Sequence, residues 1–319
     1  MNNYNAIPIF FSIDNSYAPY LAVALNSAIK NSSKNRDYRA IVLHRELSDE
    51  NMSRLAELET ENFSIEFYEM TQGLDAITDR ESNYLRCDYF TLTIYFRLFI
   101  ATMFKELDKA IYIDSDVVVL SDIAELYDTD LGSNLIGACQ DKSVIDVPPL
   151  AKYMEECVGV NKYEYINSGV LLMNLKALRD CKFDEHFLNL LNTYHFNSIA
   201  PDQDYINAIC NGKIHYLSEA WDTMPNDNGK EVTDPKLIHY NLFSKPWCYD
   251  NIQYEDYFWF YAEDSGYLRE ILENKKDYTD VQKDNDSKCL SILIQNGELF
   301  CDDEITFKKM YDKGVKIRI

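Results

Sequence analysis

Ala110-Ile111-Tyr112-Ile113-Asp114-Ser115-Asp116-Val117-Val118-Val119-Leu120 is the stretch of sequence from which the fold of this chain can be worked out. Apolar, β-prone residues lead into two aspartates, and this pattern predicts a buried strand that ends at Asp114. Residues i and i+2 share a face of extended backbone, so Asp114 and Asp116 are expected to face one point. Two converging carboxylates repel each other unless a cation or a proton lies between them. A divalent cation with oxygen ligands is the natural occupant.

The Asp-X-Asp pattern alone is weak, because it recurs in this acidic chain. It is also found at 128–130, 202–204 and 284–286. Only the pair at Asp114 and Asp116 interrupts an apolar, strand-like run. The context therefore singles out this pair as the candidate metal site.

Composition indicates a folded globular protein with a strongly acidic balance of charge. The chain has 319 residues, 46% hydrophobic, which is enough for one large α/β domain or two small ones. Its net charge of -22 argues against nucleic acid as a partner. If the ligand is an anion, a metal or a few basic residues must supply the local positive charge that binds it. No apolar run approaches the roughly 18 residues of a membrane span, so a cytoplasmic protein is expected.

Cysteine and glycine usage excludes several site classes. The eight cysteines are scattered with no CxxC pair, which favours free thiols in a reducing compartment. None of the ten glycines forms a GxGxxG or GxxxxGK motif. Dinucleotide-binding and P-loop functions are therefore disfavoured.

The order of predicted elements indicates a parallel, doubly wound sheet. Strands are predicted at 6–13, 39–44, 64–68, 135–139, 166–175, 214–217 and 237–239, and helices at 17–30, 48–59, 91–104, 122–127, 183–194 and 202–210. At the C-terminal end, residues 251–276 are expected to be helical and 274–288 to form a polar linker. Residues 289–301 are predicted to form a β-hairpin around Asn296-Gly297, followed by a basic tail.

Six motifs in order resemble the family 8 glycosyltransferases of bacterial surface-polysaccharide and lipopolysaccharide synthesis. The resemblance covers about residues 6–250. The motifs are Ser12-Ile-Asp14-Asn-Ser-Tyr17-Ala-Pro-Tyr20, Tyr95-Phe-Arg97-Leu, Asp114-Ser-Asp116, Asn167-Ser-Gly169-Val-Leu-Leu-Met-Asn174, Pro201-Asp-Gln-Asp204 and His239-Tyr-Asn-Leu-Phe-Ser-Lys245-Pro-Trp247.

This resemblance implies a GT-A fold, with a mostly parallel central sheet flanked by helices. It implies a transferase domain at 1–250, with a C-terminal region at 251–319 that carries the helical segment, linker, hairpin and tail. The expected reaction moves glucose or galactose from a UDP-sugar, with retention, to a saccharide or lipid-linked saccharide acceptor. Mn²⁺, or Mg²⁺ in its place, is the implied cofactor.

The resemblance also assigns a metal site and a phosphate-binding lysine. Asp114, Asp116 and His239 are the implied ligands, and an imidazole beside two carboxylates shifts the preference from magnesium toward manganese. Lys245 is expected to stabilise the charge that develops on the departing diphosphate. The family usually has glycine three residues after the histidine, where this chain has Leu242. A β-carbon there is expected to affect how the loop approaches the diphosphate.

Other residues are assigned to the donor by the same resemblance. Asp14, Asn15 and Tyr17 would bind uridine, with Tyr17 stacking on the base. Arg97 would approach the sugar or diphosphate. The sugar pocket and the rest of the donor site would be lined by Asp114, Ser115, Asn167, Asp202 and Gln203.

The catalytic set implied by the resemblance is Asp202, Gln203 and Lys245. Gln203 is a poor nucleophile for a double displacement. We therefore expect the acceptor to attack from the face of the leaving group, with a phosphate oxygen helping to deprotonate its hydroxyl.

Two other functions fit parts of the sequence. Asp114 and Asp116 also match the nucleophile motif of haloacid-dehalogenase-like phosphatases, in which the first aspartate is phosphorylated. An inactive sugar-nucleotide-binding protein would follow if Leu242 disabled the phosphate loop.

The basic tail at 305–319 would allow at most a peripheral contact with the inner face of an anionic membrane.

Overall fold

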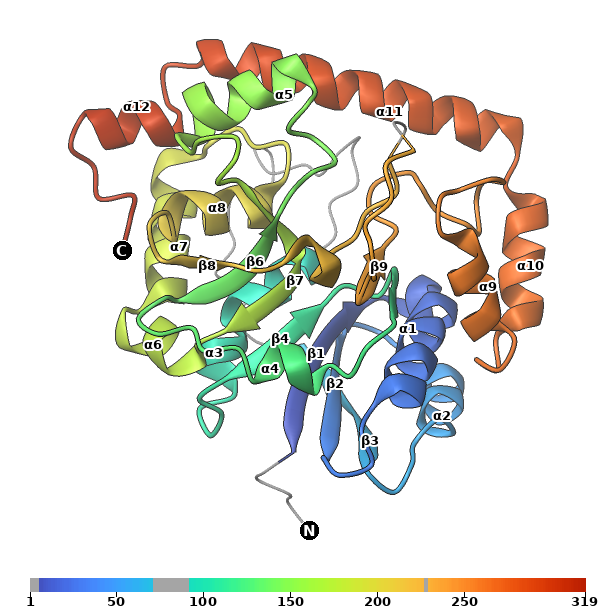
Figure 1. The fold of residues 1–319 in the computed structure, drawn as a ribbon. Helices are drawn as coiled ribbons and strands as arrows, with labels where there is room; N and C mark the ends of the chain where they lie inside the picture. The colour runs from blue at the N-terminus through green and yellow to red at the C-terminus, as the bar shows by residue number, and fades with distance from the viewer. Residues whose placement is uncertain (1–5, 71–91, 227–228) are drawn as a thin grey trace.

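The computed structural model describes residues 6–70, 92–226 and 229–319. Its centre is a seven-stranded sheet in the order β3-β2-β1-β4-β7-β6-β8 (Figure 1). The strands are β1 Ile7–Ile13, β2 Tyr38–His44, β3 Phe63–Glu69, β4 Ala110–Ile113, β6 Ile136–Gln140, β7 Ile166–Met173 and β8 Ile214–Tyr216. All neighbours pair in parallel except β7, which is antiparallel to both β4 and β6. The predicted mostly parallel sheet is confirmed.

Helices cover both faces of the sheet, as an alternating strand pattern requires. In β1, Ile9 and Phe11 face the core under α1, whereas Phe10 belongs to the core on the opposite face. The helices are α1 Ala18–Asn31, α2 Asp49–Ala56, α3 Ile100–Met103, α4 Ala124–Tyr127, α5 Pro148–Tyr153, α6 Leu175–Asp180, α7 Phe183–Tyr194, α8 Pro201–Ile209, α9 Glu255–Ala262, α10 Leu268–Asp277, α11 Asp280–Leu299 and α12 Phe307–Asp312.

The sheet topology reverses between β1 and β4. From β1 the chain proceeds outward to β2 and β3, and then returns to place β4 on the other side of β1. At such a switch point the connections diverge and leave a crevice at the carboxyl ends of the strands. Asp14 follows β1 and Asp114 follows β4 at this edge.

A small second sheet brings the C-terminal part of the family motifs to the crevice. It consists of β5 Val117–Val119 and β9 Leu237–His239, paired antiparallel. Val117 pairs with His239. Strand β5, which directly follows Asp116, is therefore not part of the main sheet. Its pairing with β9 places His239 beside Asp116.

The predicted linker and hairpin in the C-terminal region are wrong. Helix α10 continues to Asp277, and α11 begins at Asp280 with a capping box between Thr279 and Gln282. Residues 289–301 belong to α11 and the 3₁₀ turn after it. Gly297 is no hairpin turn: a β-carbon there would lie 2.8 Å from Leu150 Cδ2, so the glycine permits close packing of α11 on α5.

The helix predicted at 91–104 is mostly a 3₁₀ segment. Leu92–Phe99 forms 3₁₀ turns and only Ile100–Met103 is α-helical, while residue 91 lies outside the described part of the chain. Long 3₁₀ runs are uncommon and often mark functional segments. Here the run carries Arg97 into the crevice, where its side chain is 5% exposed.

The C-terminal helices pack on both cores. Helices α9 and α10 contact α1, whereas α11 crosses over α5 (Figure 1). Phe258 and Ile271 are buried on the α1 side, and Phe307 is buried on the other. None of the helices in the described ranges has the length and apolarity needed to span a bilayer. The seven cysteines within those ranges are free thiols.

Candidate functional site

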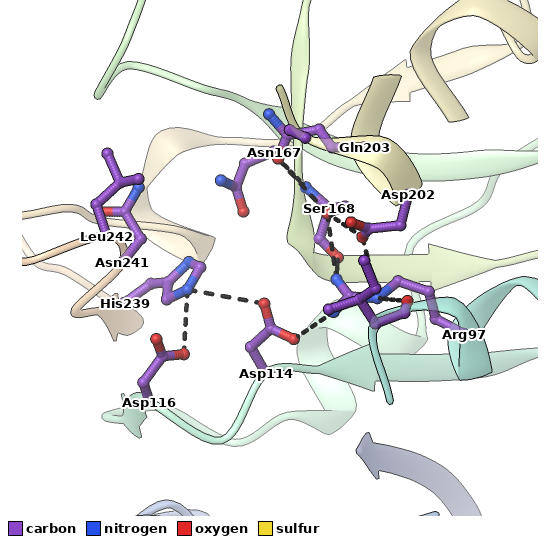
Figure 2. Close-up of a pocket in the computed structure, with 12 residues that line it drawn as sticks. Arg97, Asp114, Asp116, Asn167, Ser168, Asp202, Gln203, His239, Asn241 and Leu242 are labelled. Atoms are coloured by element: carbon purple, nitrogen blue, oxygen red, sulfur yellow. Dashed lines mark hydrogen bonds and ion pairs between the residues drawn. The ribbon is translucent and has the colours of Figure 1, made fainter. Parts of the chain in front are cut away.

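Asp114, Asp116 and His239 come together at the switch point. One ligand atom from each lies within 4.8 Å of the others. His239 Nε2 is 3.2 Å from Asp116 Oδ1 and 4.0 Å from Asp114 Oδ2 (Figure 2). Two carboxylates and one imidazole form a donor set that suits a divalent transition metal. The predicted metal ligands therefore converge.

The surroundings of the triad also fit a metal ion. Asp116 Oδ1 is buried and makes no proper hydrogen bond within the described part of the chain; its close polar neighbour is His239 Nε2 at 3.2 Å, so this oxygen is available to a cation. A β-carbon on Gly169 would lie 2.3 Å from His239 Cε1 and 2.8 Å from Asp114 Oδ2. Only glycine leaves room for these ligands at this point of β7.

Asp222 orients the histidine from behind. Its Oδ1 accepts a hydrogen bond of 2.9 Å from His239 Nδ1, and its side chain is fully buried. This bond leaves Nε2 free to face the aspartates, as in the carboxylate–histidine pairs of many metal sites. Burial would lower the pKa of His239, but the charges of Asp116 and Asp222 outweigh it and raise the pKa to about 10.

The two aspartates are held by different cations. Asp114 Oδ1 accepts hydrogen bonds from Arg97 Nη2 at 2.8 Å and from the Tyr112 hydroxyl at 2.9 Å. Burial nevertheless raises the pKa of Asp114 above its ordinary value, against the opposing charge of Arg97. Asp116 is ion-paired with Lys245. Burial alone would raise the pKa of Asp116, but Lys245 and His239 lower it well below the usual range.

A small cavity of about 130 Å³ opens beside the triad. Its volume is on the scale of a single sugar ring. Arg97 and Asp114 line it, as do Asp116 and His239 (Figure 2). The remaining lining residues are Ile94, Asn167, Ser168, Ala200, Asp202, Gln203, Asn241 and Leu242. The predicted sugar-pocket residues Asn167, Asp202 and Gln203 thus share one cavity with the triad.

Buried polar contacts orient these side chains. Arg97 Nε lies 3.3 Å from Asp202 Oδ2. Gln203 Oε1 accepts from Ser168 N at 3.0 Å, and Gln203 Nε2 donates to Asp141 Oδ2 at 2.9 Å. Both ends of the Gln203 amide are therefore engaged, which sets its orientation.

The predicted uridine residues do not share that cavity. Asp14 accepts from Ser16 N and Tyr17 N as the cap of a 3₁₀ turn. Asn15 accepts from Ser48 N at 2.9 Å. A second cavity shares Leu242 with the first, and Tyr17 and Lys245 line it. Ser115, which was predicted to line the donor site, is buried and lines neither cavity. Their assignment to the nucleotide remains a prediction.

Leu242 adopts the backbone conformation that the expected glycine would favour. Its φ is +53°, in the left-handed region where a β-carbon is strained. Its side chain packs at the edge of the hydrophobic core and borders both cavities. The loop thus keeps a glycine-like path despite the substitution.

Sequence reasoning missed Asp141 and Asp222. Neither is part of an Asp-X-Asp motif, and each reaches the site only through a side-chain contact across the fold. Asp141 directly follows β6, so its place at a strand end was a usable signal. No comparable pattern marks Asp222.

Comparisons with known proteins agree with this geometry. A model of glycosyl transferase family 8 matches residues 8–251. A Haemophilus influenzae protein described as a glycosyltransferase is 32% identical over 69% of this chain, and the match covers 64% of its own length, under two thirds. The lipopolysaccharide 1,2-glucosyltransferase of Escherichia coli is 25% identical over 80% of this chain and 78% of its own.

Solved structures show the same fold. The galactosyltransferase LgtC, in complex with donor and acceptor sugar analogues, superimposes with a TM-score of 0.69 and 26% identity over 81% of this chain and 95% of its own. The bifunctional glycosyltransferase WbbM gives a TM-score of 0.72 at 25% identity, over 86% of this chain and 52% of its own. These likenesses confirm the GT-A fold and decide against the phosphatase alternative. This chain belongs to glycosyltransferase family 8.

Proposed function

We propose that the chain transfers glucose or galactose from a UDP-sugar to a saccharide acceptor with retention of anomeric configuration. The observation that carries this proposal is the position of the triad, with Lys245 on Asp116, at the edge of a sugar-sized polar cavity. A diphosphate at the triad would place its sugar among Asn167, Asp202 and Gln203. Their amide and carboxylate groups suit sugar hydroxyls.

Asp114, Asp116 and His239 would hold the cation, and the nitrogen ligand favours Mn²⁺ over Mg²⁺. When bound, a divalent cation would offset charge on the diphosphate. Lys245 would exchange Asp116 for a phosphate oxygen and add a second positive charge where the leaving group becomes more negative. Arg97 is ion-paired with Asp114 and Asp202, so its role would be to position these two carboxylates.

We assign the acceptor attack to the leaving-group face of the sugar. A bond would form between the acceptor oxygen and the anomeric carbon as the bond to the β-phosphate oxygen breaks. The acceptor proton would pass to a phosphate oxygen. Gln203 would orient the sugar, because an amide is a poor nucleophile and both of its ends are already engaged.

The relatives support a surface saccharide as acceptor, since one of them is a lipopolysaccharide glucosyltransferase. Such acceptors are consistent with a cytoplasmic enzyme that contacts the membrane at most through its basic tail. Two lysines of the tail already have partners within the chain. Lys308 pairs with Asp312, and Lys309 donates to the carbonyls of Cys301 and Asp303. Deletion of residues 313–319 should weaken binding to anionic vesicles if the tail makes this contact.

The test is UDP release from UDP-glucose and UDP-galactose with Mn²⁺, with Mg²⁺ and with chelator. Release should require the metal, be faster with Mn²⁺, and fall on the order of 100-fold or more in Asp116→Asn. Asp284→Asn, an exposed aspartate of another Asp-X-Asp motif, is the matched control and should keep wild-type rates. Metal-dependent UDP binding without turnover of either sugar would instead favour the inactive sugar-nucleotide-binding protein.

A further inference from the structure

The loop that follows β9 carries Lys245 and has little regular structure of its own. The Lys245 side chain pairs with Asp116 and is 11% exposed. The backbone around it forms a single turn, in which the carbonyl of Lys245 accepts from Cys248 N and Tyr249 N at 3.0 Å each. A single turn of backbone is unstable without contacts from outside it, because fixing its dihedral angles costs more than one or two hydrogen bonds return. The position of Lys245 therefore depends on what holds this turn.

Lys275 on α10 binds both ends of the turn. Its Nζ donates to the carbonyl of Pro246 at 2.9 Å and to that of Tyr249 at 3.0 Å, and lies 2.8 Å from Asp250 Oδ1. A lysine ammonium has three N–H donors, and each has an oxygen of residues 246–250 within reach. The side chain of Asp250 is 78% exposed, so its ion pair adds little stability. The two charge-assisted bonds to backbone carbonyls are therefore the main contact.

Asp286 on α11 supports the same turn through Tyr249. Its Oδ2 accepts from the hydroxyls of Tyr249 at 2.7 Å and of Tyr278 at 2.6 Å. Tyr249 is thus held at its carbonyl by Lys275 and at its hydroxyl by Asp286. Trp247, in the middle of the turn, is buried and stacks on an aromatic ring of α1 at 4.2 Å between centroids. The turn is therefore anchored by α1 and by the pair of helices α10 and α11.

Lys275 and Asp286 lie beyond the part of the chain that the family model matches. The match ends at residue 251, whereas α10 begins at Leu268 and α11 at Asp280. Figure 1 shows α10 beside α1, with α11 leading from it across the top of the molecule. A loop of the shared part is therefore held by contacts from the C-terminal region.

We infer that Lys275 is a positioning residue for the transfer reaction and that it acts through Lys245. The inference rests on the proposed function, in which Lys245 stabilises charge on the departing diphosphate. With the carbonyls of Pro246 and Tyr249 bound to one ammonium, the turn keeps the path that directs the Lys245 side chain to Asp116. Loss of that ammonium would take a charged donor from both carbonyls and allow the turn to rearrange.

Lys275→Met is the test variant, because methionine keeps an unbranched stem and removes all three donors. Hydrogen–deuterium exchange followed by mass spectrometry should become about 10-fold faster across residues 242–250. The kcat for UDP release from the preferred UDP-sugar with Mn²⁺ should fall on the order of 10-fold, with a smaller change in KM, because Lys245 acts on charge that develops in the transition state. Lys276→Met, at an exposed neighbouring position, is the matched control and should leave both quantities at wild-type values.

A double-variant cycle separates positioning from a general structural role. If Lys275 acts through Lys245, Lys275→Met should lower kcat by less than about 2-fold once Lys245→Met is present. An equal loss in both backgrounds would overturn the inference, since Lys275 would then act by another route. Wild-type exchange across residues 242–250 in Lys275→Met would overturn it as well.

Lys275→Arg keeps the positive charge and carries the same test if the methionine variant does not fold. A planar guanidinium cannot direct three donors at oxygens that surround one nitrogen, so exchange across residues 242–250 should still rise, and kcat should still fall. Wild-type exchange and kcat in this variant would overturn the positioning role alone. Absence of UDP release in the wild type, with either sugar, would overturn the proposed function and the positioning role with it.

Discussion

The orientation of His239 at the candidate metal site depends on Asp222, a residue outside the triad of candidate ligands. Asp222 accepts a hydrogen bond from His239 Nδ1, and its other oxygen is buried with no hydrogen-bond partner among the residues that the structure describes. A buried carboxylate with a free lone pair is costly unless its charge is used. Its use here is to hold the imidazole ring in one orientation, with Nε2 toward Asp116.

Asp222→Asn should therefore weaken Mn²⁺ binding about 10- to 100-fold, the usual effect of removing such a partner. Mn²⁺ titration followed by electron paramagnetic resonance measures the affinity without any turnover. Asp141→Asn is the matched control, because Asp141 is an equally buried carboxylate that contacts Gln203 and Asn167 instead of a metal ligand. Equal losses of Mn²⁺ affinity in the two variants would show that Asp222 acts only through its negative charge and not through its hydrogen bond to His239.

Leu242 stands where the family resemblance predicts a glycine, and its backbone lies in the left-handed region. A left-handed conformation costs a residue with a β-carbon roughly 1–2 kcal/mol. The leucine side chain offsets part of that cost by packing against the core. Two substitutions separate these effects, because alanine removes the packing and keeps the β-carbon, while glycine removes both.

Leu242→Gly should be more stable than Leu242→Ala by about 1 kcal/mol in urea unfolding. Comparable substitutions at Leu290, which is helical and partly exposed, should give the opposite order, because glycine destabilises a helix relative to alanine. If the alanine variant at 242 proved the more stable, the left-handed strain would not be the controlling factor.

At the scale of elements, the Asp-X-Asp motif on α8 shows how one pattern serves two purposes. On a helix, residues i and i+2 point to different sides. Asp202 faces Arg97 and the sugar-sized cavity, whereas Asp204 turns into the core. Asp204 accepts from Tyr153 at 2.7 Å, Tyr165 at 2.6 Å and Ser198 at 2.5 Å, and so joins α5, the start of β7 and α8.

Asp204→Ala should lower the free energy of unfolding by about 2–4 kcal/mol, because three buried hydroxyls would lose a charged acceptor. Urea denaturation followed by circular dichroism measures the loss. Glu298→Ala, an exposed carboxylate on α11, should change stability by less than about 0.5 kcal/mol. A loss at Asp204 no larger than that of the control would mean that water replaces the carboxylate.

Elements with strong periodicity were predictable from the sequence, and those set by distant contacts were not. The first three strands and α7 follow directly from local patterns, and the family motifs identified the triad before its geometry was known. The hairpin prediction failed at Asn296-Gly297 because the glycine serves helix packing against Leu150, which no local pattern reveals. Asp222 was missed for the same reason, since only the fold brings it to His239.

At the scale of the whole molecule, the C-terminal region is built into both cores. Phe258, Tyr267 and Ile271 are buried with α1 on one face of the sheet. Leu293 and Phe307 are buried on the other face. The division into a transferase domain at 1–250 and a region at 251–319 remains a prediction about function. In packing terms, the second part covers apolar surface of the first.

Removal of residues 251–319 should therefore leave a chain that does not fold cooperatively, because large apolar areas on both faces of the sheet would be exposed to water. The chain of residues 1–319 should unfold in one transition by calorimetry, with equal calorimetric and van't Hoff enthalpies. A milder truncation after residue 304 removes only α12 and the tail, and should lower the melting temperature while keeping one transition. Two separate transitions in the chain of residues 1–319 would contradict this shared core, and would mean that α9 to α12 form a unit that is stable by itself.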